Sequence, residues 1–570
     1  MESKSHYGYL DGAGMSRIQQ DRNLTAKPTE QLHGHRDMLR VATARSRQIS
    51  VGIVGAGFAG LRCADLLLQH GCKVTIFEAR DRLGGRVAQS NHLGHMVDLG
   101  PNWIHGTDNN PILQIAKHTG TELHAWDEEQ VVINTDGEPV HDLEAGEYAQ
   151  LLWDDGVIAD AFRYSNEHHN ALDAKRSLYD FFVEKAEGMF ADEPADVARR
   201  KRETFLQTAS MWGSYVGSPV TRQSLKFFWL EECIEGENPF VAGTYHKILE
   251  AVATPAREGA DVRLNTRVGR VFSKDAGGEM ESDGHCPKPG IQTSDGSSLE
   301  FDEVVVTTPL GWLKRNLDAF QPALPARLRE AIGNIGYGTL DKVYITFPSA
   351  FWDTPTSPVH RSTNGVDAQG KTPNVTATTA PLHQAPSQEP RVHYPGFTHW
   401  LAPEYAKDSN PQQWDQQGMN LAALPSACAH PTILFYIYGA CSKHIADLVS
   451  SSTSEDERDA QLLSFFEPYY SRLRDYDPSR PECKPKAVLA TAWANDEFAG
   501  YGSYCNFQVG LENGDKDIEA MRHGMPERGI WFAGEHTAPF VALGTSTGAY
   551  WSGEGVAKRI LKAYGLEENS

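Results

Sequence analysis

Three glycines near the N-terminus have the spacing of a phosphate-binding loop. Gly55, Gly57 and Gly60 follow the apolar run at residues 51–54 and precede a helical pattern at about 58–69. In such a strand–turn–helix unit, one glycine makes the tight turn, one lets the backbone approach a pyrophosphate, and one lets the helix pack against the strand. The N–H groups and the positive dipole at the start of the helix favour a bound phosphate. The spacing indicates a nucleotide site, although an ordinary glycine-rich turn has the same pattern.

An acidic residue extends this candidate site. The apolar run at residues 73–77 ends in Glu78, where a carboxylate is placed to bind a ribose hydroxyl. An acid at this position disfavours a 2′-phosphate, which leaves FAD or NAD as the ligand. The next residues include Arg80 and the sequence Gly-Gly-Arg86. The two glycines permit close backbone approach, and Arg86 can neutralise a phosphate.

The far end of the chain repeats part of this pattern. An apolar run at residues 530–533 leads into Gly534 and Glu535, and a helix then begins among small residues after Thr545. A helix N-terminus of this kind is again suited to phosphate. A single NAD-binding unit does not need a second cradle, so the pattern favours one nucleotide site divided between two distant segments.

Three other segments contain residues that could act on a substrate. His105 lies in a loop pattern at 95–106 and titrates near neutrality, but a lone histidine is more often structural. Lys342 lies in the alternating run at 338–347, where such a position usually faces solvent. The acids at 231–237 could hold a cation, although a solvated helix end is the favoured interpretation.

Composition limits the classes of function. The net charge is −22, which disfavours a nucleic-acid partner; the acidity could attract small cations or merely maintain solubility. The eight cysteines show no C-x-x-C spacing, as in proteins of a reducing compartment, and no metal site is indicated. The sequence contains no apolar run long enough to span a membrane, no secretory pattern at its start and no peroxisomal signal at its end. We therefore expect a cytoplasmic location.

Together these motifs resemble the flavin-containing amine oxidases, a family that includes polyamine oxidases, monoamine oxidases and flavin histone demethylases. The resemblance covers about residues 50–565 and leaves out a Pro-, Ser- and Thr-rich insertion at 353–395. It rests on the glycine fingerprint with Gly-Gly-Arg86, the distant Ala-Gly534-Glu535, and Lys342 in Gly-x-x-x-Lys-Val. The sequence shows neither a chromatin-reading module nor the long helical insertion of a histone demethylase.

The resemblance implies a role for each matched residue in binding FAD. Val268 would present its backbone to the adenine, Glu535 would contact the ribityl and pyrophosphate region, and Thr545 would lie beside the isoalloxazine. The residues that would bind the ADP half are Gly55, Gly57, Gly60, Glu78, Arg80 and Arg86.

The resemblance also implies catalytic roles. Lys342 would hold a water at flavin N5, which changes its interpretation from a solvent-facing residue to a catalytic one. Trp493 and Tyr504 would flank the flavin ring, and Tyr504 would form one wall of an aromatic substrate cage, a surface that favours cationic amines. His105 lies in a Trp-Ile-His-Gly sequence that is similar to animal polyamine and spermine oxidases, where this histidine lies in the substrate channel.

Two departures from the family pattern affect the cofactor and the cage. Monoamine oxidases attach FAD through a cysteine at the position of Ser503, so the flavin is expected to be non-covalent, although Cys505 is close in sequence. The second cage tyrosine of monoamine oxidases corresponds to Thr545, as in polyamine oxidases and histone demethylases.

The expected fold is α/β, with a Rossmann-like FAD-binding domain built from discontinuous segments and an inserted α+β substrate-binding domain. The FAD-binding domain would comprise residues 49–134, 239–312 and 485–565. The substrate-binding domain would comprise 135–238 and 313–484, with the flexible insertion at 353–395. Within 135–238 the apolar stripes of predicted helices are interpreted as core, and residues 1–48 are predicted to form a disordered tail.

The function that follows from the resemblance is oxidation of an amine. A C–N bond would be oxidised by hydride transfer to flavin N5, and O2 would reoxidise the flavin to give hydrogen peroxide. A polyamine such as spermine or an N-acetylated polyamine is the leading substrate. The alternatives are a monoamine, an amino acid or a secondary-metabolite amine, and a flavin-fold protein that binds a ligand without turnover. A nicotinamide-dependent dehydrogenase is the weaker enzymatic alternative.

Overall fold

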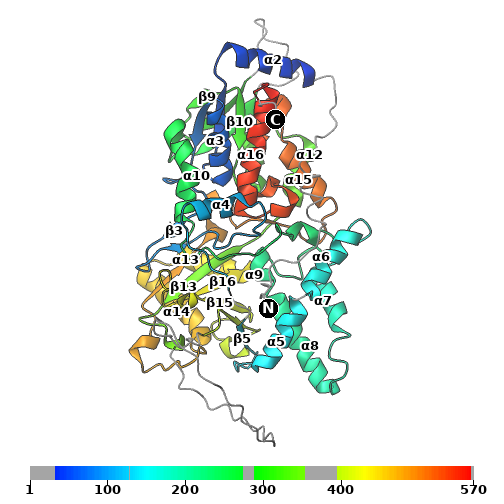
Figure 1. The fold of residues 1–570 in the computed structure, drawn as a ribbon, viewed down its shortest axis with the longest axis vertical. Helices are drawn as coiled ribbons and strands as arrows, with labels where there is room; N and C mark the ends of the chain where they lie inside the picture. The colour runs from blue at the N-terminus through cyan, green and yellow to red at the C-terminus, as the bar shows by residue number, and fades with distance from the viewer. Residues whose placement is uncertain (1–32, 127–128, 154, 274–287, 354–393, 567–570) are drawn as a thin grey trace, which may run out of the picture.

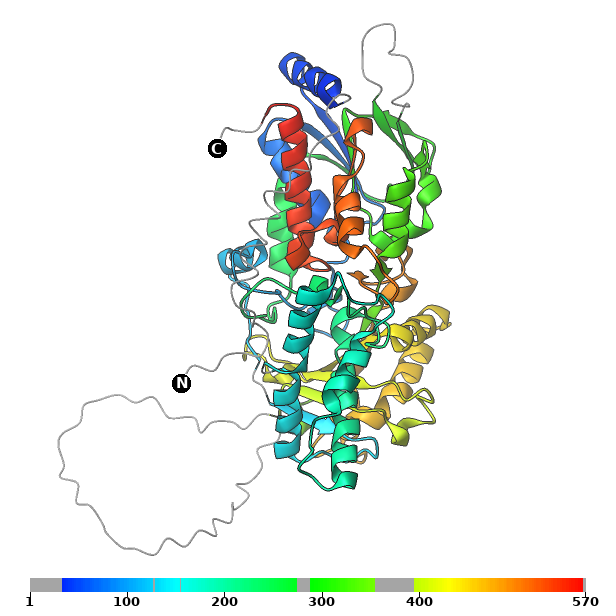
Figure 2. The same ribbon diagram turned by 90° about the vertical axis from the view of Figure 1, so that its right-hand side faces the viewer.

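The computed structural model describes residues 33–566 except for 127–128, 154, 274–287 and 354–393. Residues 1–32 of the predicted tail and nearly all of the predicted insertion therefore lie outside the described residues. The described chain forms two halves, each built around its own sheet (Figures 1 and 2).

A five-stranded parallel sheet forms the first half, in the order β19-β10-β1-β2-β6. Its strands come from three distant parts of the chain, as predicted for a discontinuous Rossmann-like domain. Strand β1 is buried along nearly its whole length, which is typical of a parallel sheet covered on both faces. The strands are β1 (Ser50–Val54), β2 (Lys73–Phe77), β6 (Asp261–Arg263), β10 (Glu303–Val306) and β19 (Ile530–Phe532).

Helices from both ends of the chain cover one face of this sheet. Helix α3 (Phe58–Gln69) packs against α10 (His246–Gly259) and α16 (Ser546–Ala563) (Figure 1). The approach of α16 is close because Gly553 faces the backbone of Ala59, where a Cβ would lie 2.1 Å from the carbonyl oxygen. This contact places the glycine-rich segment at α3 next to the small residues of α16.

A smaller four-stranded sheet packs on the other side, in the order β11-β7-β8-β9. The predicted hairpin around Asp295-Gly296 is confirmed, since β8 and β9 flank it as an antiparallel pair. Helices α12 (Ala326–Asn334) and α15 (Gly514–His523) pack together beside this sheet. The strands are β7 (Val268–Ser273), β8 (Pro289–Thr293), β9 (Ser298–Glu300) and β11 (Phe320–Gln321).

The second half is built on a six-stranded sheet, in the order β17-β13-β16-β15-β14-β5. Helices α13 (Gly439–Ser451) and α14 (Glu455–Tyr470) pack against it. Both faces of β13 are buried. The interpretation of its alternating sequence as a strand with one solvent-facing side is therefore wrong. The strands are β5 (Gln130–Ile133), β13 (Leu340–Thr346), β14 (Phe397–Trp400), β15 (Gln416–Asn420), β16 (Thr432–Tyr438) and β17 (Ala487–Ala490).

Strand pairing differs from the predicted domain boundaries in three places. Strands β5 and β17 pair within the six-stranded sheet, although the boundaries at 134/135 and 484/485 assigned both to the nucleotide-binding domain. Strand β11 and helix α12, predicted to belong to the other domain, pack on the nucleotide-binding side. A short strand carries no sequence signal for its pairing partner, which explains these shifts.

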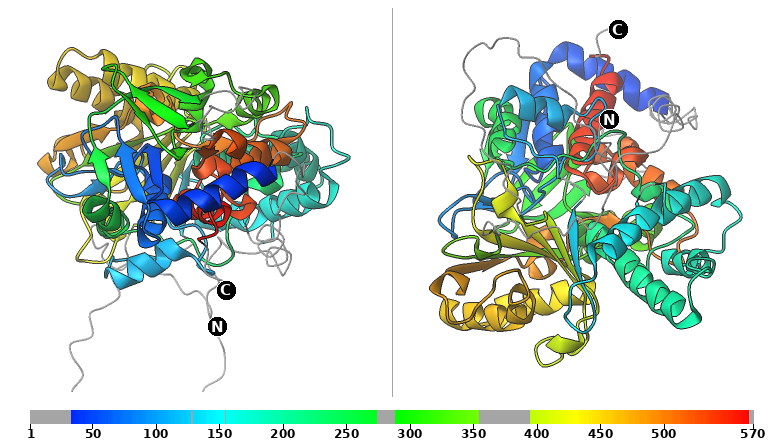
Figure 3. Two further views of the ribbon diagram at one scale, coloured as in Figure 1. Left: turned by 90° about the horizontal axis from the view of Figure 1, so that it is seen from above. Right: turned by 60° about the horizontal axis from the view of Figure 1, so that its bottom comes forward.

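A group of helices stands beside the six-stranded sheet, as predicted for residues 135–238. In Figure 3 (right) these helices form a separate cyan-to-green layer next to the yellow sheet. They are α5 (Asp142–Leu152), α6 (Val157–His168), α7 (Leu178–Ala186), α8 (Ala195–Ser210) and the short α9 (Gly213–Val216).

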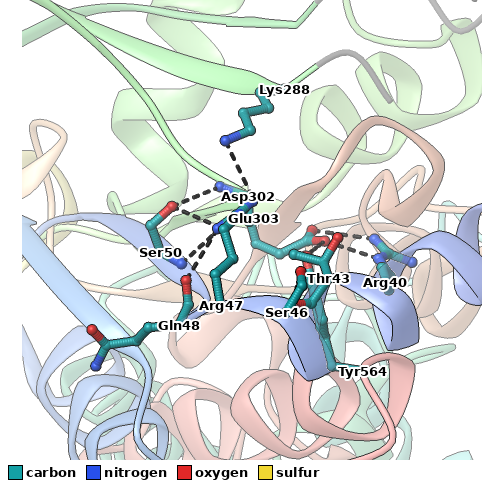
Figure 4. A network of polar contacts seen from close by, with 10 residues as sticks. All are labelled: Arg40, Thr43, Ser46, Arg47, Gln48, Ser50, Lys288, Asp302, Glu303 and Tyr564. Carbon is teal, nitrogen blue, oxygen red and sulfur yellow. Dashed lines mark hydrogen bonds and ion pairs between the residues drawn. The ribbon is translucent and has the colours of Figure 1, made fainter. Parts of the chain in front are cut away.

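Helix α2 (His33–Ser46) corrects the prediction of a disordered segment up to residue 48. Seen from above, it lies across the end of the nucleotide-binding half, and it packs against α16 (Figure 3, left). Arg40 is buried and donates to Glu303 at 2.9 and 3.2 Å, and Arg47 pairs with Asp302 (Figure 4). Because these partners are more than 250 residues away, the polar sequence of the segment contained no signal of its order.

Candidate active site

A cavity of about 650 Å³ lies where the two halves and the helices meet. It is lined by residues from the glycine loop, from β13, from the helices and from the C-terminal cradle. Of the residues predicted to bind cofactor or substrate, the cavity brings together Gly57, Arg86, His105, Lys342, Trp493, Tyr504, Glu535 and Thr545. Those that do not line it are Gly55, Gly60, Glu78, Arg80 and Val268.

The positions of Gly55 and Gly60 agree with a tight turn and a close helix–strand approach, while the role of Gly57 toward a pyrophosphate stays a prediction. Gly55 has φ +103°, and Gly60 lies so close that its Cβ would be 2.1 Å from the Gly55 carbonyl oxygen. Gly57 lines the cavity, and no atom of the described chain lies within 4 Å of where its Cβ would be. Gly57 is also the N-cap of α3 and makes no side-chain cap, so the first N–H groups of the helix remain suited to a phosphate.

Glu78 and Arg80 lie next to the glycine loop, and Glu78 is hydrogen bonded to it. The buried Glu78 carboxylate accepts hydrogen bonds from the Ala56 N–H at 2.8 Å and the Arg80 N–H at 2.9 Å. The Arg80 guanidinium is paired with Asp496 at 2.7 Å. Val268 begins β7 and is buried next to this region. These residues border the loop, and their roles toward the adenosine half of FAD stay predictions.

An ion pair joins the two cradles across the cavity. Arg86 donates to the Glu535 carboxylate at 3.0 Å and to the Ser503 carbonyl at 2.5 Å. Burial opposes the charge on Glu535, but Arg86 outweighs it and holds the pKa of this carboxyl below its usual value. Glu535 also accepts from the Cys505 N–H at 3.3 Å. The N-terminal and C-terminal motifs therefore form one continuous polar wall.

The loop at residues 98–103 is held by the six-stranded sheet. Its first three carbonyl groups each accept a hydrogen bond from a side chain of the other half of the molecule. The bonds are Tyr344 hydroxyl to Asp98 at 2.6 Å, Trp493 Nε1 to Leu99 at 2.9 Å, and Lys342 Nζ to Gly100 at 2.5 Å. We refer to residues 98–103 as the clamped loop. Two of the three donors, Lys342 and Trp493, are residues predicted to face the flavin.

Lys342 is buried among groups that alter its charge. Burial lowers its pKa to about 8, against the opposing effect of the Asp98 and Asp341 carboxylates. Its Nζ lies 5.4 Å from the centre of the Tyr436 ring. Burial also raises the pKa of Asp98 to about 7, although hydrogen bonds from Gln89 and Tyr245 oppose this rise. Lys342 is therefore a buried amine whose proton is held weakly.

Sequence reasoning missed Asp341, which positions the residues around Lys342. Its fully buried carboxylate accepts from the Thr491 hydroxyl at 2.6 Å, the Trp493 N–H at 2.7 Å and the Ser442 hydroxyl at 2.8 Å. A carboxylate in a strand that also contains Val343, Tyr344 and Ile345 was the available signal, since such a group needs several partners when it is buried.

The remaining predicted residues form the other walls. The Tyr504 hydroxyl donates to the Tyr215 carbonyl at 2.6 Å, which fixes the ring at the cavity surface. Thr545 caps α16, accepting from the Gly548 N–H at 2.9 Å. Burial lowers the pKa of His105 to about 4, so its imidazole is neutral at physiological pH.

Acidic and aromatic residues of the helical segment also line the cavity, and for the acids this contradicts the sequence interpretation. Glu231, Glu232 and Glu235 belong to the lining rather than to a solvated helix end, and Trp153 packs against the core of the helical segment and also lines the cavity. Burial raises the pKa of Glu231 to about 8, although the Phe507 N–H opposes this rise. Sequence periodicity does not distinguish a cavity wall from a core or a solvated face, because all three use the same residue types.

Comparison with known proteins identifies the family. The family model of flavin-containing amine oxidoreductases matches residues 58–561. The chain belongs to this family. FAD is therefore its cofactor, which resolves the choice between FAD and NAD. The open space at Gly57, the start of α3 and the paired Arg86 and Glu535 fit the phosphates and the ribityl chain of this group.

Curated relatives are polyamine oxidases and histone demethylase homologues. A probable polyamine oxidase 4 from Arabidopsis thaliana is 28% identical, with 54% of this chain and 59% of that protein covered. A lysine-specific histone demethylase 1 homologue from rice is 28% identical, covering 90% of this chain and 52% of that protein. The match thus spans just over half the length of these two relatives. A rice polyamine oxidase 4 is 25% identical over 91% of both chains.

A solved structure shows the same fold. A double mutant of putrescine oxidase with redesigned cofactor binding superimposes with a TM-score of 0.60 at 16% identity, covering 90% of this chain and 99% of that chain.

Neither a metal-binding group of side chains nor a membrane-spanning helix is present in the described residues. They contain no group of three or more His, Cys, Asp or Glu side chains placed to hold a metal, and none of their helices is long and apolar enough to cross a membrane.

Proposed function

We propose that this amine oxidoreductase oxidises a C–N bond of a polyamine such as spermine or an N-acetylated polyamine. When bound, FAD would supply the redox chemistry, namely hydride acceptance from the amine at flavin N5 and reoxidation by O2 to give hydrogen peroxide. The observation that carries the proposal is a single cavity in which the FAD cradle continues into a wall of aromatic rings and carboxylates. The carboxylates that line it are Asp155, Glu231, Glu232, Glu235 and Glu535.

The protein residues bind and orient the amine. Tyr504 presents a rigid aromatic face, because its hydroxyl is held by the Tyr215 carbonyl. His105 is neutral and can accept a hydrogen bond from a substrate ammonium, which would hold the amine in place. Lys342, held at the clamped loop, would keep a water beside the flavin.

Anaerobic mixing with spermine tests this function. The flavin spectrum should bleach within seconds when spermine is added to the purified holoenzyme without O2, and peroxide should form once air is admitted. If monoamines or amino acids bleach the flavin spectrum and spermine does not, the proposed polyamine substrate is wrong and the amine that reacts takes its place. If no amine in a broad panel bleaches the flavin, the non-catalytic ligand-binding alternative is favoured.

We also propose that FAD is bound without a covalent link. Ser503 lines the cavity at the position expected for the cysteine attachment, and a serine cannot form that thioether. Cys505 is buried outside the lining, and burial keeps its thiol protonated by raising its pKa. Denaturation followed by filtration should release all of the flavin; yellow colour that stays with the chain would contradict this assignment.

A further inference from the structure

Part of the cavity is lined by aromatic rings of the helical segment rather than by residues of the FAD cradle. Trp153 ends α5, Phe162 lies on α6, and Trp212 and Tyr215 lie at α9. The Trp212 and Tyr215 rings are stacked with centroids 5.3 Å apart, and Trp153 lies 5.8 and 5.7 Å from them. We call these four residues the distal aromatic cluster. None of them was singled out from the sequence as a binding residue.

This cluster is fixed to the part of the site that faces the flavin. Tyr215 accepts from the Tyr504 hydroxyl through its carbonyl, while its own hydroxyl lies 3.5 Å from Gln417 Nε2. Gln417 is itself held by the buried Ser214 hydroxyl at 2.7 Å. Tyr215 therefore connects the flavin-proximal wall to the distal one, and a substrate that reaches past Tyr504 meets the cluster.

The charges around the cluster favour a cation. Asp155 also lines the cavity and its side chain is 79% exposed, with Arg163 3.6 Å away, and Glu232 and Glu235 belong to the same lining. Among the described lining residues the cationic side chains are Arg86 and Lys342, which are held by groups of the FAD side. Aromatic faces beside carboxylates attract ammonium groups by cation–π and Coulomb interactions.

We propose that the distal aromatic cluster binds the second ammonium group of an elongated diamine or polyamine while the first amine lies at the flavin. This inference rests on the proposed function and makes it more specific, because a monoamine would leave the distal cluster unused. Trp212 is then a residue that determines specificity, since its ring contacts all three other rings of the distal aromatic cluster.

The test compares spermine with an analogue in which one terminal amine is replaced by a methyl group. The two molecules have the same length and differ in one positive charge. Anaerobic flavin reduction at increasing amine concentration gives the dissociation constant and the limiting rate separately. In the wild type the analogue should bind at least about tenfold more weakly, while its limiting rate stays within about twofold of that of spermine.

Variants of the cluster complete the test. Trp212→Leu should weaken spermine binding about tenfold and make the dissociation constants of the two amines equal. Trp212→Phe should retain most of the affinity for spermine and most of the difference between the two dissociation constants. Tyr179→Leu is the matched control, because Tyr179 is a partly buried aromatic of the same helices outside the cavity lining. Equal binding of the two amines by the wild type, or equal weakening of both by Trp212→Leu, would overturn the inference. The absence of flavin reduction by any amine would instead refute the proposed function itself.

Discussion

The two cationic side chains of the cavity differ in how firmly their charge is held. Arg86 forms an ion pair with Glu535 and retains its charge at any physiological pH. Lys342 donates to the Gly100 carbonyl, and its pKa of about 8 lies within reach of physiological conditions. The first residue is suited to neutralising a phosphate, and the second is suited to hydrogen bonding and proton exchange near the reacting atoms.

Replacing Lys342 with methionine should slow catalysis without unfolding the site. Lys342→Met keeps the length of the side chain but removes the donor to Gly100 and the proposed contact to a water beside the flavin. We expect flavin reduction or reoxidation to slow by at least about tenfold, equivalent to about 1.4 kcal/mol of barrier. Stopped-flow measurement of both half-reactions checks this. Unchanged rates in both, with a normal flavin spectrum, would remove Lys342 from the mechanism.

Individual residues could be assigned a structural role from the sequence where the backbone conformation permits only one residue type. The roles of Gly55, Gly57 and Gly60 were predictable because each depends on the absence of a Cβ atom. Asp341 and Glu231 were not predictable, because their importance depends on partners and on a cavity brought together by folding.

The glycine loop and α3 act as one element whose positions tolerate a methyl group to different degrees. At Gly60 a Cβ would collide with the Gly55 carbonyl, which belongs to the rigid turn after β1. At Gly57 a Cβ would extend into the open cavity. The same chemical change should therefore disturb packing at one position and cofactor binding at the other.

Two alanine substitutions test this distinction. Gly60→Ala should lower stability by about 1–3 kcal/mol, since the backbone must shift to relieve the contact. Gly57→Ala should fold normally but lose at least about tenfold in FAD affinity. Thermal unfolding and titration of the flavin-free protein with FAD measure the two effects. Gly555→Ala, at an open position of α16, serves as the control. Normal FAD affinity in Gly57→Ala would refute the role of Gly57.

The prediction was accurate for strands and helices whose two ends are marked by turn residues in the sequence. The strands and helix around the glycine fingerprint and the hairpin at Asp295-Gly296 belong to this group. The assignments that differed were those of β5, β11, β17, α12 and α2. Strand pairing decides where the three strands belong, and packing on α15 decides where α12 belongs. Long-range ion pairs order α2, so local propensity could not reveal any of these assignments.

Across the whole molecule, α2 joins segments that are far apart in the sequence. The Glu303 carboxylate at the start of β10 accepts from Arg40 and, at 3.0 Å, from the Tyr564 hydroxyl (Figure 4). It also accepts from Trp531 Nε1 at 2.7 Å. A helix before β1, a central strand, an edge strand and the end of the C-terminal helix therefore share one buried charge.

Loss of the Arg40 charge should destabilise the nucleotide-binding half. Arg40→Met leaves Glu303 fully buried without its cation, and breaking a buried pair in this way costs about 3–5 kcal/mol. Arg45→Met on the exposed side of the same helix should have little effect. Thermal unfolding of both variants with FAD present makes the comparison. Equal stability of the two variants would show that α2 is dispensable.

The neighbouring pair at Asp302 should make stability depend on pH in acid. Burial would raise the pKa of Asp302, but Arg47 and Ser50 outweigh it and hold the value at about 2, below the usual 3.8. A pKa lowered by folding stabilises the folded state above pH 4, and this contribution is lost as the pH falls from about 4 toward 2. The difference in unfolding temperature between wild type and Asp302→Asn should be constant from pH 7 to 5 and narrow by pH 3. A constant difference throughout would contradict this assignment.

The order of strands in the parallel sheet has a consequence for synthesis on the ribosome. Strand β10 lies between β1 and β19, yet β19 and the Glu535 cradle are translated only after residue 529. Until then β10 has an unpaired apolar edge, and Arg86 lacks its carboxylate partner. A chain that ends before residue 529 would lack both the outer strand of this sheet and the carboxylate partner of Arg86, so we expect binding of FAD to depend on the C-terminal segment.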